Sequence, residues 1–319
     1  MGVANLLVRE YSSLDLRFSS ALGKSMRRIT LNIPGAGCEY QKKTGGCMMC
    51  GFHVATNKYS RGKLLPVWIF QLLSILAWKF YAKEKPSELF VYNGGSFWND
   101  REIPRAFQRW LFGYIAFQKS IQRVMVENRC EYITGEKIKE AVTFLGGKEL
   151  LVGIGLESSN DYLRNIIIKK GLTRKDFERT VKLINDNGAR VAAYIFLKPL
   201  GLTDEEALED VISTIKYALS VGVFEINVSC AFIQEKTEMA KAYLAGKFVP
   251  PKLNVVVDLI SSAKSNNLPV NIGGFDDYPP PIDIPKNCEN CSPSFYDLIE
   301  NFRKNGVLGE IPQCNCRAI

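Results

Sequence analysis

The chain has 319 residues, of which 46% are hydrophobic and 23% are charged. This composition excludes an intrinsically disordered protein and is sufficient for one α/β domain of barrel size with a small addition. The 41 basic and 33 acidic residues give a formal net charge of +8, which suits an anionic partner such as RNA, although no run of five basic residues occurs. Nine cysteines with no secretory signal before them indicate a reducing compartment, so we expect a cytoplasmic protein whose cysteines bind metal.

The most hydrophobic segment, residues 67–81, is rich in Leu, Ile, Phe and Trp. Because a membrane-spanning helix needs about 20 apolar residues, this segment is too short to cross a bilayer. We expect a buried helix there and no membrane partner.

Residues 1–26 carry apolar side chains at mixed helical spacing and predict an N-terminal helix or arm. From residue 27 onward, short runs rich in Val, Ile and Leu alternate with segments of helical periodicity. We expect strands at 28–33, 88–93, 121–127, 149–157, 189–198 and 224–229. We expect helices at 65–83, 102–119, 135–146, 160–170, 174–187 and 203–220, followed by a helix at 252–266 and a short strand at 268–272.

Alternating strands and helices predict an α/β fold with a parallel sheet covered by helices. Six such strands joined by right-handed crossovers curl into a partial (β/α)6 barrel that resembles a TIM barrel, which we assign to residues 27–278. Active sites of such barrels lie at the carboxyl ends of the strands. Five strands end on a polar residue that we expect near this mouth: Asn93, Glu127, Glu157, Lys198 and Asn227. The alternative is that these are ordinary polar residues at strand ends.

A glycine-rich loop with three cysteines, Cys38, Cys47 and Cys50, follows the first strand. Three thiolates can ligate three irons of a [4Fe–4S] cluster and leave the fourth iron open to another ligand. The glycines allow the tight turns and the close backbone approach that such a loop needs. A zinc knuckle is the alternative, but its fourth ligand would have to be His53, the only histidine in the chain.

A second group of cysteines lies in residues 279–319, which begin with three consecutive prolines and form a C-terminal appendage. Its four thiols make two pairs: Cys288 with Cys291, and Cys314 with Cys316. Four thiolates form a good tetrahedral zinc site, and an auxiliary [4Fe–4S] cluster uses the same number of ligands. We favour zinc, because a closed four-cysteine site requires no chemistry to explain it. Cys130 and Cys230 are unpaired and are expected in the core or at the barrel mouth.

The spacing Cys-x8-Cys-x2-Cys after the first strand resembles the cluster loop of radical S-adenosylmethionine (SAM) enzymes, in the branch around the Elongator catalytic subunit. Asn93-Gly-Gly-Ser96, Glu127-Asn-Arg129 and Gly155-Leu-Glu-Ser158 resemble further motifs of that branch, and Lys170 occupies the place of a basic residue that commonly meets the SAM carboxylate. The resemblance covers about residues 27–275. It implies a radical SAM barrel in which Cys38, Cys47 and Cys50 hold the catalytic cluster.

The resemblance also implies which residues bind SAM. Either Met49 or Phe52 is expected to shield the adenine, and Asn93 to Ser96 to receive the amino group of the methionine moiety. The full set of expected cofactor-binding residues is Met49, Phe52, Asn93, Gly94, Gly95, Ser96, Glu127, Arg129, Glu157, Ser158, Lys170, Lys198 and Asn227.

Within this branch, the sequence is most similar to the archaeal radical SAM proteins of archaeosine formation. The similar segments are 44–52, 155–161, 198–205 and the four-cysteine tail. The resemblance implies that a 5′-deoxyadenosyl radical acts on tRNA whose 7-deazaguanine at position 15 carries a lysine adduct, and that it cleaves the C–N bond of the lysine side chain to give archaeosine. The implied partners are tRNA, the lysine-transferring subunit of archaeosine synthase and an electron donor.

Two alternatives to this function remain. One is a radical SAM enzyme of the same branch that acts on a peptide or a small molecule. The other is a non-catalytic iron–sulfur or zinc scaffold subunit of a tRNA-modifying complex. The residues themselves indicate no general acid or base.

Overall fold

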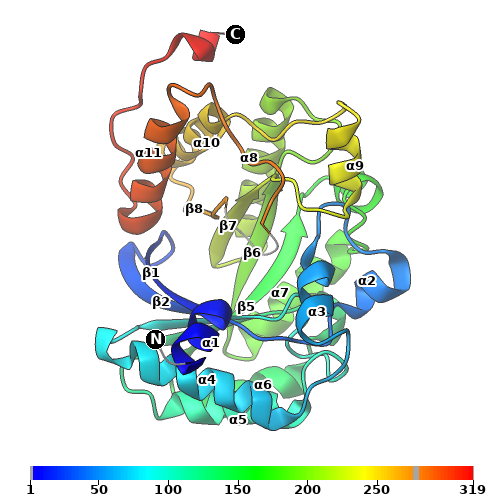
Figure 1. Cartoon of the computed structure of the whole chain (residues 1–319), viewed down its shortest axis with the longest axis vertical. Coiled ribbons are helices and arrows are strands. Elements are labelled where there is room, and N and C mark those ends of the chain that lie inside the picture. The colour runs from blue at the N-terminus through cyan, green and yellow to red at the C-terminus, as the bar shows by residue number, and fades with distance from the viewer. Residues whose placement is uncertain (1–2, 276–279, 319) are drawn as a thin grey trace.

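The structure, a computed structural model, describes residues 3–275 and 280–318. Its centre is one sheet of eight strands whose spatial order is the order along the sequence. The strands are β1 (Ser12–Ser19), β2 (Lys24–Asn32), β3 (Glu88–Tyr92), β4 (Arg123–Glu127), β5 (Glu149–Glu157), β6 (Arg190–Leu197), β7 (Glu225–Cys230) and β8 (Asn271–Ile272). The pair β1 and β2 is antiparallel, and every later neighbour is parallel. The sheet curls into a nearly closed barrel (Figure 1).

Helices follow most strands and cover the outside of the barrel (Figure 1). They are α1 (Val3–Tyr11), α2 (Glu39–Thr44), α3 (Phe52–Tyr59), α4 (Val67–Tyr81), α5 (Arg105–Ala116), α6 (Gly135–Leu145), α7 (Arg174–Asp186), α8 (Asp204–Ser220), α9 (Glu238–Leu244), α10 (Leu253–Ser265) and α11 (Ser292–Asn305). Shorter turns of helix are η1 (Ala82–Glu84), η2 (Cys130–Tyr132), η3 (Leu163–Ile167) and η4 (Asn315–Ala318). Among the described residues, no helix is both long and apolar enough to cross a membrane.

The predicted partial barrel is confirmed, because all six expected strands appear as β2 to β7 in the expected order. The side chains of these strands alternate between the two faces, as those of buried parallel strands must. In β3, for example, Leu89 and Val91 join the core under the helices, whereas Phe90 faces the barrel interior with Met125. At the start of α8, Thr203 and Glu206 bond reciprocally and form a capping box.

The N-terminal segment differs from the predicted helix or arm. Only α1 is helical; β1 follows it directly and pairs with β2 from Ser12 opposite Leu31 to Ser19 opposite Lys24. Within the segment predicted as a helix or arm, residues 12–19 are therefore extended rather than helical. Residues 12–19 alternate polar and apolar side chains with a period of two, and the edge of β2 offers them backbone partners.

The last helix, α11, was not predicted and lies over the seam between β1 and β8 (Figure 1). Phe295 and Ile299 enter the main core. Arg17 of β1 pairs with Glu300 at 2.9 Å. Because Ser20 also donates its backbone N–H to Asn271 at 2.9 Å, the two ends of the sheet meet and the barrel is nearly closed.

The amino-terminal end of the barrel is filled by charged side chains. Arg123 is 1% exposed and forms ion pairs with Glu88 and Glu225, both fully buried. Arg28 pairs with Glu88 at 2.9 Å, and its guanidinium lies 3.7 Å from the centre of the Phe90 ring. These charges close the barrel floor, so the open end is the carboxyl end of the strands.

Candidate active site

The cysteine loop lies at the carboxyl end of β2. Cys38 is the residue before α2, Gly45 ends that helix with φ 91°, and Cys50 comes two residues before α3. The three thiols are close enough to influence one another electrostatically: burial and the neighbouring Cys47 thiol raise the pKa of Cys50 to about 12, with a smaller effect from Cys38. The fold therefore gathers the three predicted ligands at one place.

Within the described residues, the three loop thiols do not lie as close together as the ligands of a single ion. In the described part of the sequence, the one group of metal-ligating side chains whose ligand atoms all lie within 4.8 Å of one another is formed by the four tail cysteines. The loop cysteines with His53 form no such group there. This spacing disfavours the zinc alternative, because ligands of one tetrahedral ion must lie close together, whereas a cluster distributes its cysteines over different irons.

The turn from Gly94 to Ser96 packs directly on the cysteine loop. A Cβ atom on Gly95 would overlap Glu102 Oε2 and would lie 3.3 Å from Cys38 Cα. Gly94 has φ +63°, and a Cβ there would lie 3.3 Å from Phe52 Cβ. Only glycines allow this approach, so the predicted amino-group turn and the predicted cluster loop share one site.

Glu102 connects the two segments and was missed from the sequence. Its Oε1 accepts hydrogen bonds from the backbone N–H of Glu39 at 3.0 Å and from Asn99 at 2.7 Å. Its Oε2 accepts a bond from the backbone N–H of Ser96. Burial raises the pKa of this carboxyl. No local motif marks Glu102, since it comes six residues after the turn in an irregular segment.

Asn93 offers an unused amide at the same place. It is 3% exposed, and neither its Oδ1 nor its Nδ2 has a hydrogen-bond partner among the described residues. Its carbonyl lies 3.1 Å from the position a Cβ on Gly35 would take, at the end of β2. A buried polar group without a partner is costly, so this amide is available to a ligand.

Glu157, Lys170 and Arg129 come together near Cys47. Lys170 Nζ lies 2.7 Å from Glu157 Oε1. Although burial alone lowers the pKa of Lys170, the nearby Glu157 carboxylate and Cys47 thiol raise it above its usual value. Arg129 donates to the Lys170 carbonyl at 3.0 Å and stacks on Tyr40 of α2, with 3.7 Å between guanidinium carbon and ring centre.

Other predicted residues have partners away from the thiols. Ser158 is fully buried and donates to Asp210 of α8 at 2.7 Å. Lys198 pairs with Asp204 at the start of α8 at 2.8 Å. Burial raises the pKa of Tyr194 inside the barrel, and the Glu127 carboxylate nearby raises it further.

Three further residues were predicted to bind SAM: Met49, Phe52 and Asn227. Met49 packs half-buried against the apolar cluster that contains Met48 and Phe196, and Phe52 lies beside Gly94. Asn227 accepts a bond from Asn271 at 3.1 Å, and its buried Nδ2 has no hydrogen-bond partner in the described part of the sequence.

The four tail cysteines converge as predicted. Their closest sulfur separations are 3.5 Å for three pairs: Cys288 with Cys291, Cys288 with Cys314, and Cys291 with Cys316. None of the nine cysteines is in a disulfide. The protein thus contains a four-cysteine metal-binding arrangement at the start of α11.

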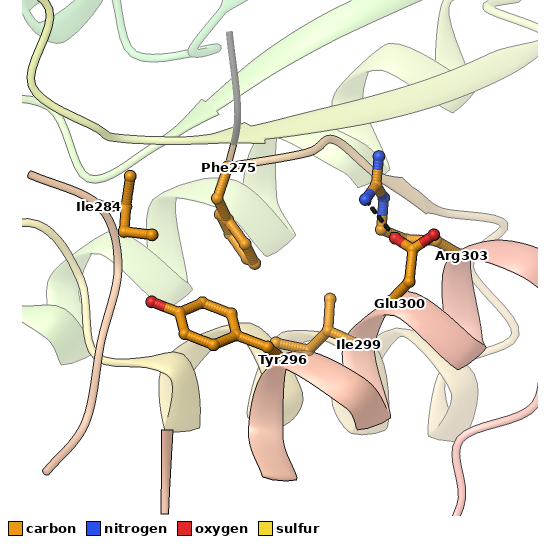
Figure 2. A pocket seen from close by; sticks show the side chains of 6 residues that line it. All are labelled: Phe275, Ile284, Tyr296, Ile299, Glu300 and Arg303. Carbon is orange, nitrogen blue, oxygen red and sulfur yellow. Dashed lines mark hydrogen bonds and ion pairs between the residues drawn. The ribbon is translucent and has the colours of Figure 1, made fainter. Parts of the chain in front are cut away.

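A hollow of about 240 Å³ between α11 and the segment after β8 is separate from the cysteine loop (Figure 2). Phe275, Ile284, Tyr296 and Ile299 make it apolar, and the ion pair of Glu300 with Arg303 borders it. None of the predicted site residues lines it. It belongs to the seam of the barrel rather than to the candidate active site.

The partial barrel of this protein is a fold that solved structures share. Among solved structures, this protein is similar to archaeal Methanocaldococcus infernus Elp3, with a TM-score of 0.54 and 17% identity over 75% of this chain and 64% of that chain. It is also similar to methylornithine synthase (PylB), with a TM-score of 0.51 and 12% identity over 77% of this chain and 63% of that chain. The match therefore spans less than two thirds of either structure, and the likeness concerns the fold.

Sequence relatives point to a particular group. The sequence is 26% identical over 308 residues to archaeosine synthase subunit beta of Methanosarcina acetivorans, covering 93% of this chain and 85% of that protein. It is 28% identical over 243 residues to the protein of the same name from Thermococcus kodakarensis, covering 76% and 74%. No family model matches the sequence. The resemblance inferred from the motifs is confirmed by these relatives and by the fold.

Proposed function

We propose that this protein is a radical SAM enzyme of tRNA modification that acts as a beta-type subunit in archaeosine formation. The observation that carries the proposal is the packing of the Gly94 to Ser96 turn, with the unpartnered amide of Asn93, against a loop of three thiols at the carboxyl ends of the strands. The two relatives named archaeosine synthase subunit beta support the substrate class.

The residues present fit a [4Fe–4S] cluster with SAM. Cys38, Cys47 and Cys50 would hold three irons and leave one open. Asn93 offers a buried donor and a buried acceptor next to that loop, and Gly95 leaves a backbone surface without side chains. When bound, these groups supply a carbon-centred radical that abstracts a hydrogen atom from the substrate.

The protein's own residues prepare the site for this chemistry. Burial raises the pKa of the Cys47 thiol, and the nearby Lys170 and Arg129 cations oppose this effect and favour the thiolate. Glu102 fixes the start of α2, and hence Cys38, relative to Ser96.

The proposed substrate is tRNA with a lysine-adducted 7-deazaguanine at position 15. Cleavage of the C–N bond between the lysine side chain and the adduct nitrogen would leave the amidine of archaeosine on the base. The lysine adduct would be made by the partner subunit, and an electron donor would reduce the cluster.

The test is anaerobic reconstitution followed by reduction with SAM present and an assay of 5′-deoxyadenosine, with and without lysine-adducted tRNA. Formation of 5′-deoxyadenosine together with archaeosine supports the proposal. Cleavage of SAM with the tRNA unchanged would support the proposed cofactor and refute the proposed substrate. Cys47→Ala should abolish SAM cleavage, whereas Cys130→Ala, a matched control outside the loop, should retain it. No SAM cleavage by a protein with an intact cluster favours the scaffold alternative.

We also propose that the four tail cysteines hold Zn²⁺. A Zn–S bond of about 2.3 Å in tetrahedral geometry places the sulfurs about 3.8 Å apart. The observed separations of 3.5 Å and the limit of 4.8 Å for all ligand atoms are close to that value. A [4Fe–4S] cluster would hold the four sulfurs farther apart, on different irons.

Metal analysis of the aerobically purified protein tests this proposal. We expect about one zinc per molecule, lost in Cys288→Ser and retained in Cys230→Ser, in which a buried cysteine outside the site is changed. Iron in the tail of a Cys38→Ala/Cys47→Ala/Cys50→Ala variant after reconstitution would instead indicate an auxiliary cluster.

A further inference from the structure

Two segments that border the cysteine loop are rich in basic residues. Residues 39–63 contain five basic residues and one acidic residue, and residues 236–252 contain four basic residues and one acidic residue. Together they account for +7 of the formal net charge of +8. The two segments, 42 residues in all, are therefore enriched in positive charge.

The fold brings both segments to the mouth of the barrel. Residues 39–63 contain α2, which starts directly after Cys38, and α3, which starts two residues after Cys50. Residues 236–252 contain α9, and the backbone N–H of Met239 donates to the carbonyl of Met48 at 3.2 Å. Figure 1 shows α2, α3 and α9 on the same side of the barrel.

Four lysines of these segments are free to meet a partner. Lys43, Lys236, Lys241 and Lys247 are exposed, and none of them forms an ion pair within the described residues. Their neighbours Lys42 and Lys169 are already paired, with Glu39 at 3.1 Å and Glu238 at 2.7 Å. We define Lys43, Lys236, Lys241 and Lys247 as the basic rim.

We propose that the basic rim binds the phosphates of tRNA and holds the nucleic acid over the cysteine loop. The proposal rests on the proposed function and adds the surface that receives the substrate. Lysine ammonium groups bind phosphates through charge and release counterions, independently of base sequence. A base held inside the tRNA would have to turn out of its stack to reach the thiols at the bottom of the rim.

The concentration of charge decides between RNA and an acidic protein as the occupant. Phosphates repeat along a nucleic acid backbone and can meet lysines on both sides of the mouth at once. The rim also surrounds the site where the proposed reaction takes place, and a protein seated there would cover the entrance. An acidic surface of the partner subunit is the competing occupant, and the test separates the two.

The test compares two variants with the same change of charge. In the rim variant, Lys43, Lys236, Lys241 and Lys247 are all replaced by Gln. In the control variant, Lys139, Lys175, Lys216 and Lys264 are replaced by Gln; these are exposed lysines on α6, α7, α8 and α10. The dissociation constant for tRNA is measured from 50 to 200 mM salt for both variants and for the unchanged protein.

We expect the rim variant to bind tRNA at least about tenfold more weakly than the control variant at 50 mM salt. The slope of log K against log salt should fall by about 0.9 for each lysine that contacts a phosphate. The control variant should keep the slope of the unchanged protein. Equal affinities and slopes for the two variants would overturn the proposal, as would a rim variant that binds tRNA normally but no longer binds the partner subunit.

A SAM-cleavage assay separates this inference from the proposed function. The rim variant should form 5′-deoxyadenosine from SAM alone at the rate of the unchanged protein, because the rim lysines are not at the thiols. Suppose that the unchanged protein converts tRNA and that the rim variant converts it equally well at low tRNA concentration. The basic rim is then not the tRNA-binding surface, whereas the proposed function is supported. If the unchanged protein binds tRNA through the basic rim but converts none, the proposed binding surface is supported and the proposed reaction is refuted.

Discussion

Lys170 and Glu157 form a buried ion pair beside the cysteine loop, with 2.7 Å between Nζ and Oε1. Their side chains are only 14% and 8% exposed. Glu157 holds this position with φ 66°, in the left-handed region that residues other than glycine rarely adopt. The two residues that the sequence assigns to SAM binding therefore already bind each other, and this pair fixes the cation next to Cys47.

Replacing one member of this ion pair should lower the free energy of unfolding more than replacing both members. Lys170→Met or Glu157→Gln alone leaves one buried charge without its partner, and each should lower the free energy of unfolding by about 3 kcal/mol. The double variant should recover part of that loss, because neither charge remains. Urea unfolding of the three variants measures this. Strict additivity of the two single effects would contradict a direct interaction.

Gly95→Ala should damage the site, because its Cβ would overlap Glu102 Oε2. We expect loss of the Glu102 bridge and at least about tenfold weaker SAM binding, a change of about 1.4 kcal/mol. The control is Gly113→Ala in α5, where no atom lies within 4 Å of the new Cβ. That change should stabilise the protein by about 0.5–1 kcal/mol, since alanine favours a helix. Isothermal titration with SAM and thermal unfolding distinguish the two variants, and unchanged SAM binding in Gly95→Ala would refute the expectation.

Arg123→Met should destabilise the barrel floor strongly. The arginine is 1% exposed and pairs with Glu88 and Glu225, which would be left buried without this cation. We expect a loss of about 3–5 kcal/mol in denaturant unfolding. Arg190→Met, which removes a half-exposed arginine paired with Glu149 at 3.0 Å, should cost less than about 1 kcal/mol. Similar losses of unfolding free energy for the two variants would contradict the expectation that the buried ion pairs of Arg123 stabilise the barrel floor.

The contact between α11 and β1 should weaken in acid. Partial burial by itself raises the pKa of Glu300, but Arg303 and Arg17 outweigh it, so the pKa in the folded protein is lower than the usual value of 4.5. A lowered carboxyl pKa stabilises the fold above pH 4.5, and this contribution is lost as the pH falls through the folded value. Glu300→Gln should therefore lower the melting temperature at pH 7, and the difference from the unchanged protein should shrink below about pH 4.5. A difference that is constant with pH would contradict this linkage.

Local sequence patterns were sufficient for much of this architecture. The six strands β2 to β7 were predicted because continuous apolar runs mark strands buried on both faces, and the intervening helices have a period of 3.6 residues. The glycines at 94 and 95 and the spacing of Cys38, Cys47 and Cys50 are also local. The pairing of the tail cysteines into one group was predicted from their number and spacing.

The sequence alone did not reveal the contacts that join distant segments. Glu102, the ionic floor around Arg123 and the closure of the barrel by α11 depend on side chains that meet only after the strands have curled. Residues 12–19 alternate polar and apolar side chains, but only the folded protein shows that the edge of β2 offers them backbone partners. The sequence by itself determined the order of strands and the places of the cysteines and polar residues that follow them, because those signals are local. Only the tertiary structure decided which buried charges pair and which lysines surround the mouth, because burial and proximity are properties of the folded protein.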